Sequence, residues 1–171
     1  MKMQNKLSGK FQIFVDLDGV LADFDLGVKA ITGKYPSEMT PGKMWKILAS
    51  QKNFFSKLKW MPDGKKLWQA VLPYNPVVLT GLPLGKWAEP QKRTWCRNEL
   101  GETVPVITGM SKDKPYLAID WLEENRLDWK IPLLIDDRLK LKEPWENTGG
   151  IFILHLDADS TIKELKEKGI I

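Results

Sequence analysis

Residues 11–24 read Phe-Gln-Ile-Phe-Val-Asp-Leu-Asp-Gly-Val-Leu-Ala-Asp-Phe, an apolar run that ends in two carboxylates and a glycine. The first five residues carry little polarity, which is typical of a strand buried on both faces of a parallel sheet. In open α/β sheets the binding crevice lies just outside the carboxyl ends of such strands. We therefore expect Asp16 and Asp18 to project into a functional site, with Gly19 allowing a sharp turn.

Two carboxylates at this spacing favour covalent phosphate chemistry. The first can attack a phosphorus atom and form an aspartyl-phosphate, while the second handles a proton. Because carboxylates this close repel one another, we expect a bound cation to keep one of them ionised while the other stays protonated. The alternative is a pair that caps or forms a turn, since Asp is common in turns.

A second apolar run, residues 131–138, also ends in paired acids, Asp136 and Asp137. If the two strands end at the same edge of the sheet, four carboxylates meet there. Such a cluster needs a hard cation, and Mg²⁺ is the usual choice where phosphate oxygens and water complete an octahedron. A solvated turn remains the alternative for this pair taken alone.

Two further runs supply groups that suit a phosphate site. Residues 76–81 end in Thr80 and Gly81, whose hydroxyl and backbone N–H can bind a phosphate oxygen. Residues 104–109 form a fourth expected strand, and the helix expected after it begins near Lys112 and Lys114. A lysine there can neutralise both the nucleophile and the incoming phosphate.

The order of these pieces along the chain resembles the haloacid dehalogenase-like superfamily of phosphohydrolases. The resemblance covers most of the chain. More narrowly, residues 16–24 together with residues 135–138 resemble the 5′(3′)-deoxyribonucleotidase family, whose members hydrolyse nucleoside monophosphates with Mg²⁺.

The resemblance implies a role for each motif residue. Asp16 becomes the nucleophile and a metal ligand, and Asp18 the general acid/base with its backbone carbonyl on Mg²⁺. Thr80 and Lys114 become phosphate binders. The remaining metal positions are Asp137 as a ligand and Asp136 as a support for the metal or its waters.

Four residues are implied as contacts of a nucleotide. Phe24 and Arg138 match family positions that contact it, and an aromatic ring or a guanidinium suits a base and its polar edge. Trp45 and Phe54 resemble family positions and are our candidates for stacking on the base, which contributes about 1–3 kcal/mol per base. For each aromatic residue, burial in a small core is the competing interpretation.

The chain departs from the family pattern in two places. Gly81 follows Thr80 where relatives carry a second hydroxyl, so a backbone N–H is the expected replacement. Residues 116–130 look like an added helix before Asp136, which leaves Lys112 as an alternative to Lys114.

The 62 positions between Asp18 and Thr80 exceed what a crossover between neighbouring strands needs. We therefore predict a three-layer, Rossmann-like α/β core formed by residues 1–23 and 73–171. Residues 24–72 form a small helical cap in this prediction, and caps of this kind exclude water and select the leaving group.

Composition fits one enzyme domain. The 171 residues, 43% of them hydrophobic, can build one sizeable core. No stretch suits a membrane span, and residues 1–7 lack the apolar core of a secretory signal, so we expect a cytoplasmic protein. The single cysteine, Cys96, excludes an intrachain disulfide, and the lone His155 is expected to be structural.

The net charge of +4 attracts phosphate compounds without identifying a nucleic-acid binder. Scattered basic residues, Lys92 among them, are expected to be solvated, and no nucleic-acid-binding motif is present. A small nucleoside monophosphate is thus the expected partner, and a homodimer stays open. The rival functions are phosphatase action on a polynucleotide end or another phosphomonoester, and a non-catalytic nucleotide-binding domain.

Overall fold

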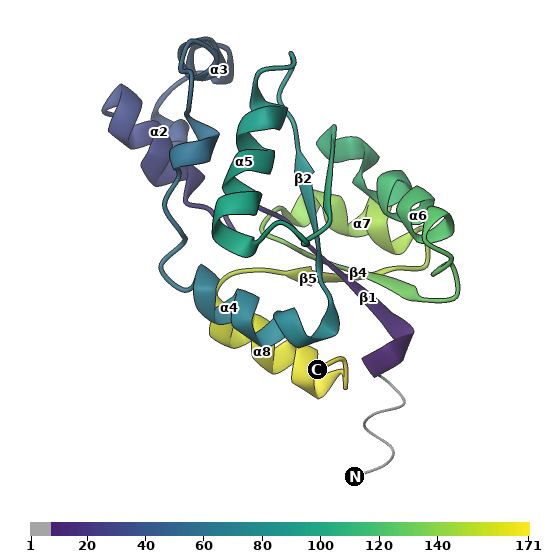
Figure 1. Ribbon diagram of the computed structural model, residues 1–171. Coiled ribbons are helices and arrows are strands. Elements are labelled where there is room, and N and C mark those ends of the chain that lie inside the picture. Colours follow the sequence, from purple (N-terminus) through teal and green to yellow (C-terminus); the bar gives the residue numbers. More distant parts are fainter. Residues whose placement is uncertain (1–7) are drawn as a thin grey trace.

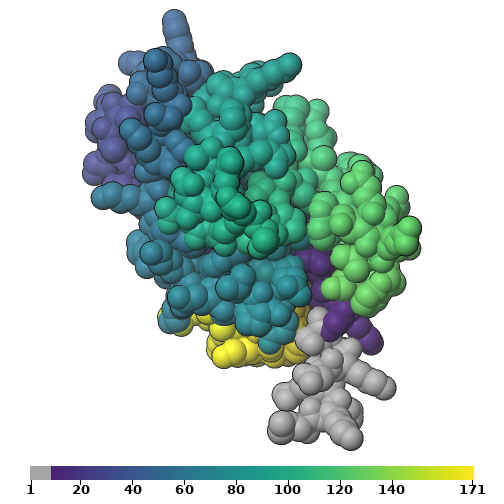
Figure 2. All heavy atoms as spheres, in the orientation of Figure 1, coloured from purple at the N-terminus to yellow at the C-terminus, as the bar shows by residue number. Residues whose placement is uncertain are grey.

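The computed structural model describes residues 8–171, drawn as a ribbon in Figure 1 and with all heavy atoms in the same orientation in Figure 2. Residues 1–7, on which the expectation about a secretory signal partly rests, lie outside the described residues. Every helix within the described part is too short or too polar to cross a membrane.

Five parallel strands form one sheet in the order β3-β2-β1-β4-β5, with the first strand of the chain at its centre. The strands are β1 (Phe11–Val15), β2 (Val77–Gly81), β3 (Val106–Gly109), β4 (Ile131–Asp136) and β5 (Ile151–Leu154). The four runs expected to be strands in the sequence analysis are strands, and β5 completes the sheet. The predicted parallel α/β fold is therefore confirmed.

Strand register decides which residues meet at the carboxyl edge of the sheet. Val15 lies beside Ile135, so Asp16 and Asp136 leave neighbouring strands at the same level. On the other side, Gly81 of β2 lies beside Gly109 of β3. The register thus places the expected functional residues along one edge.

Helices cover both faces of the sheet and make the predicted three layers (Figure 1). On one face, α6 (Lys114–Glu124) and α7 (Lys142–Glu146) pack around Phe14, whose ring meets Trp121 and Trp145 edge to face, each with centroids 5.9 Å apart. Phe14 is fully buried. The alternation along β1 directs its neighbours Ile13 and Val15 into the opposite core.

The opposite face is covered by α4 (Gly64–Val71), α5 (Ala88–Leu100) and α8 (Ala158–Glu167). The side chain of Asp157 accepts the Ser160 N–H and caps α8, so this helix begins before Thr161. Thr161 lies inside the helix, where its hydroxyl is 2.9 Å from Nδ1 of the buried His155. This contact gives the lone histidine a structural partner.

Two short helices follow β1 and lie together at one end of the molecule (Figure 1). They are α2 (Phe24–Thr32) and α3 (Pro41–Ala49), with the 3-10 turns η2 (Pro36–Glu38) and η3 (Phe55–Lys57) between and after them. Asp23 caps α2 by accepting the Leu26 N–H, and Gly33 ends it at a φ of 76°. Helix α4, which the cap prediction includes, packs against α8, and Ala158 N–H donates to Asp63. The segment that lies apart from the core layers in Figure 1 is therefore shorter than the predicted cap, residues 24–72. The division of the chain into cap and core stays a prediction.

Helix α5 connects the helical segment, which comprises α2, η2, α3 and η3, to the core. The Gln91 side chain accepts the Phe55 N–H at 2.9 Å and donates to the Gln51 carbonyl at 3.3 Å. Trp95, which is 1% exposed, donates its ring N–H to the Leu58 carbonyl at 2.8 Å. One helix face therefore holds residues 51–58.

Replacing Gln91 with alanine should lower the free energy of unfolding by about 1–3 kcal/mol, because the buried Phe55 N–H would lose its acceptor. Urea denaturation measures this change. Gln51→Ala is the matched control, since the side-chain amide of Gln51 bonds only to an exposed hydroxyl among residues 8–171, and it should change stability by less than about 0.5 kcal/mol. Equal effects of the two variants would contradict this account of the anchor.

Candidate active site

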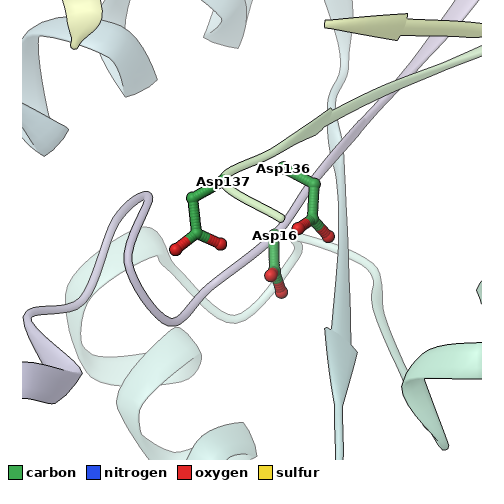
Figure 3. Close-up of side chains that lie close together, drawn as sticks. All are labelled: Asp16, Asp136 and Asp137. Carbon is green, nitrogen blue, oxygen red and sulfur yellow. The ribbon is translucent and has the colours of Figure 1, made fainter. Parts of the chain in front are cut away.

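Three acidic side chains converge at the carboxyl edge of β1 and β4 (Figure 3). One carboxylate oxygen from each of Asp16, Asp136 and Asp137 lies within 4.8 Å of the others. Asp16 and Asp136 are almost fully buried, whereas Asp137 is exposed. The structure therefore brings together the two acidic pairs that lie far apart in the sequence.

A buried lysine lies between two of these carboxylates. The Nζ atom of Lys114 is 2.9 Å from Oδ1 of Asp16 and 2.6 Å from Oδ2 of Asp136, and its side chain has no exposure. Lys112 is exposed to solvent. The structure thus brings Lys114 to the acidic cluster and leaves Lys112 outside it.

Asp16 is held in its ionised form. Its burial would raise its pKa, but the positive charges of Lys114 and Arg138 outweigh the burial and leave the pKa below its ordinary value. Oδ1 accepts the Leu17 N–H at 2.8 Å as well as facing Lys114, while Oδ2 is 3.8 Å from the Arg138 guanidinium. Oδ2 is therefore the less engaged oxygen.

Asp18 has the opposite setting. Burial and the negative charge of Asp16 raise its pKa, and this effect exceeds the lowering by Lys92. Two carboxyl groups whose pKa values are displaced in opposite directions suit a nucleophile and a proton donor. The side chain of Asp18 is not in the three-carboxylate cluster, and metal binding through its backbone carbonyl stays a prediction.

The cluster fits a divalent cation. Both oxygens of Asp136 already accept hydrogen bonds, from Lys114 and from the Arg138 N–H, so Asp16 and Asp137 have the freer oxygens. Although Asp137 as a residue is exposed, partial desolvation of its carboxyl group and the charges of Asp16 and Asp136 raise its pKa to about 7. An all-oxygen donor set with unrelieved negative charge is what Mg²⁺ binds.

Gly19 makes room for this arrangement. Its φ is +78°, a region that favours glycine, and a Cβ atom at this position would collide with the Asp137 carboxylate. The glycine of the first motif is thus required both by the turn and by the second acidic pair.

A hydroxyl from the turn after β3 lies beside Gly81. Thr80 is fully buried and accepts a hydrogen bond from Lys92 at 3.0 Å. The Ser111 hydroxyl, just after β3, occupies the space that a Cβ at Gly81 would need, and Arg138 donates to it at 3.0 Å. Its own proton remains available for a ligand in the adjoining cavity. A side-chain hydroxyl, in place of the expected backbone N–H alone, therefore lies beside Gly81.

A cavity of about 840 Å³ opens in front of these groups. Phe24, Trp45 and Arg138 line it, as expected for contacts of a ligand. Phe54 does not: its side chain is 5% exposed and its ring packs edge-on against Phe24, with centroids 5.7 Å apart. The structure thus places Phe54 in the interior of the helical segment rather than on the cavity wall.

Besides Ser111, sequence reasoning missed Trp87 and Lys92 among the residues that line this cavity. Trp87 lines it from the core side, with its ring centroid 6.5 Å from that of Trp45. Lys92 was expected to be solvated, but it is 1% exposed and its ammonium contacts Asp18 at 2.5 Å. The helical spacing offered a signal for Lys92, because it shares a face with the buried Ala88 and Trp95.

Comparisons with known proteins bear on the fold. No protein-family model and no curated protein matches the chain. Among solved structures, a haloacid dehalogenase-like family hydrolase from Streptococcus pneumoniae is similar at a TM-score of 0.57 and 12% sequence identity, over 92% of this chain and 91% of that one. At this identity the likeness shows a shared fold.

The crowded carboxylates lead to a prediction about stability. Since folding raises the pKa of Asp137 to about 7, its charged form is disfavoured in the folded state, and metal-free protein should lose stability as the pH rises from about 4 to about 7. At about pH 8 with a chelator, Asp137→Asn should therefore melt higher than the unchanged protein, by about 2–4 °C for each kcal/mol relieved. At about pH 4 the difference should vanish.

Differential scanning fluorimetry across this pH range measures the effect. Added Mg²⁺ should raise the melting temperature of the unchanged protein more than that of Asp137→Asn, because binding to the folded state is stabilising. Equal melting temperatures at both pH values, or an equal response to Mg²⁺, would contradict the assigned repulsion and metal site.

Proposed function

We propose that this chain is a Mg²⁺-dependent phosphomonoesterase of the haloacid dehalogenase-like superfamily that hydrolyses nucleoside monophosphates through an aspartyl-phosphate. The observation that carries the proposal is the contrast between Asp16, held ionised by Lys114, and Asp18, whose pKa is raised, two residues apart at the end of the central strand. The shared fold with a haloacid dehalogenase-like hydrolase agrees with it.

In the first step, a carboxylate oxygen of Asp16 attacks phosphorus and forms an acyl phosphate bond as the ester P–O bond breaks. Asp18 gives its proton to the departing sugar oxygen. In the second step, Asp18 takes a proton from water, whose oxygen attacks phosphorus, and cleavage of the P–O bond to Asp16 releases phosphate. Positioning and charge neutralisation supply most of the acceleration.

The phosphate would be held by groups at the ends of three strands. Gly81 and Ser111 line the cavity, and the Ser111 hydroxyl can donate to a phosphate oxygen, whereas Thr80 and Lys114 are fully buried and lie outside the lining. Mg²⁺, held by Asp16 and Asp137 with support from Asp136, would neutralise charge on the phosphoryl group.

The leaving group would occupy the aromatic end of the cavity. Phe24, Trp45 and Trp87 present rings there, and Arg138 presents a half-buried guanidinium. A volume of about 840 Å³ is within the range of small-molecule sites and accommodates a nucleotide. These features favour a nucleoside over a small sugar as the leaving group.

The test is phosphate release with Mg²⁺ from a panel of nucleoside 5′- and 3′-monophosphates, deoxy and ribo. A sugar phosphate and a 3′-phosphorylated oligonucleotide complete the panel. We expect selective release from mononucleotides that a chelator abolishes. Release from the oligonucleotide alone would point to a polynucleotide end as substrate, and metal-dependent nucleotide binding without release would point to a binding domain.

Asp16→Asn should abolish turnover, by more than about 10⁴-fold, because an amide cannot form the acyl phosphate. Its fold should persist, since the amide keeps the shape of the carboxylate. Asp120→Asn, on the exposed surface of α6, is the matched control and should keep full activity. Retained turnover in Asp16→Asn would sink the covalent scheme.

A further inference from the structure

The ammonium group of Lys92 is buried and uses all its donors on protein oxygens. Nζ lies 2.5 Å from Oδ2 of Asp18, 2.7 Å from the Gly81 carbonyl and 3.0 Å from the Thr80 hydroxyl. It also lies 4.5 Å from the centroid of the Phe55 ring, which covers it from the helical segment. An ammonium has three N–H donors, so this geometry fixes its position.

The contact divides the two oxygens of Asp18 into different roles. Oδ2 is held by Lys92, whereas Oδ1 is buried and has no hydrogen-bond partner within residues 8–171. Asp18 lines the cavity. A buried polar atom without a partner is costly unless a ligand satisfies it, so Oδ1 marks where a ligand oxygen belongs.

We propose that Lys92 is a positioning residue that holds Asp18 through Oδ2, so that Oδ1 alone exchanges the proton with the leaving-group oxygen and then with water. The inference rests on the proposed function and adds to it the residue that orients the proton donor. Lys92 itself does not touch the reacting atoms.

A direct role in binding the phosphate is the competing reading of a buried lysine. The contacts of Lys92 argue against it, because its three donors face Asp18, Gly81 and Thr80. The Ser111 hydroxyl and the Arg138 guanidinium already line the cavity and can meet a phosphate. A phosphate binder and a positioning residue differ in what their loss changes.

The leaving group separates the two readings. A nucleoside departs as a poor leaving group and needs a proton, whereas p-nitrophenolate departs without one. In single turnovers, Lys92→Met should release the nucleoside at least about 100-fold more slowly, since general acid catalysis contributes about 10²–10⁴-fold. Release of p-nitrophenol should change by less than about threefold, and the substrate concentration that gives half the maximal single-turnover rate should stay within about threefold for both esters.

A second readout follows from the second step. Because Asp18 also activates the water, Lys92→Met should accumulate the aspartyl-phosphate when it is supplied with p-nitrophenyl phosphate, which acid quenching and mass spectrometry detect. Lys86→Met, an exposed lysine near the start of α5, is the matched control and should leave all rates unchanged.

Two further variants cover the risk that removing a buried charge unfolds the protein. Lys92→Arg keeps the charge but alters its geometry and should show the same selective loss for the nucleoside ester. In an Asp18→Asn background, Lys92→Met should add less than about threefold, because a residue that acts through Asp18 has nothing left to position.

Equal losses for both esters, an increase in that half-maximal concentration with the maximal rate unchanged, or full additivity with Asp18→Asn would overturn the positioning role. Those results leave the proposed function standing if Asp16→Asn is inactive. Failure of the unchanged protein to release either leaving group would overturn the proposed function and the positioning role together.

Discussion

The structure depends on the buried ammonium of Lys114 between Asp16 and Asp136. Burying two ionised carboxylates at neighbouring strand ends costs a prohibitive free energy unless a counter-charge is present. One lysine at the first position of α6 supplies that charge to both carboxylates. The parallel pairing of β1 with β4 fixes the separation of the two acids. The pairing of β1 with β4, the start of α6 and the balance of charge therefore depend on one another.

That constraint leaves negative charge in excess at the edge of the sheet. When all four carboxylates are ionised, Asp16 and Asp136 share Lys114 and Asp18 pairs with Lys92. Arg138 is the third cation beside them within residues 8–171, so the charge of Asp137 is not fully balanced. The imbalance falls on the carboxylate that is most open to solvent. A folded chain that tolerates such repulsion has a place for a cation, and the fold is ready to gain stability when one binds.

Helix α5 connects this charged edge to the segment that follows β1. Lys92 faces Asp18, while Gln91 and Trp95 on the same helix hold residues 51–58. The ring of Phe55 lies against the ammonium of Lys92. Movement of the helical segment would therefore shift the Phe55 ring and alter the contact between Lys92 and Asp18. Under the proposed mechanism, water exclusion and proton transfer would then be coupled.

The strands and their acidic ends could be predicted from the sequence because a buried parallel strand reads as a short apolar run, and its next residue is the one delivered to the edge. The same pattern predicted a lysine at the start of the helix after β3 but left Lys112 and Lys114 both open, and only the family resemblance implied Lys114. Trp87 and Ser111 could not be found this way. Their positions depend on which loops the register brings side by side, and Ser111 reaches the site only because Gly81 and Gly109 are neighbours across β2 and β3.

The structure places Lys92 and Phe54 differently from the predictions, in both cases because packing decides which side chains are buried. A lysine is solvated by default, and only the packing of α5 against the sheet shows that Lys92 is enclosed. Phe54 was expected to stack on a base, but its ring is buried in the interior of the helical segment, because a small segment needs aromatic rings for its core. Within the cluster, the oxygens that have hydrogen-bond partners belong to groups packed between strands and helices. The oxygens without a compensating partner, Oδ1 of Asp18 and the carboxylate of Asp137, belong to residues that line the cavity. Carboxylate oxygens that lack a compensating partner and belong to residues of one cavity distinguish a ligand site from a set of structural ion pairs.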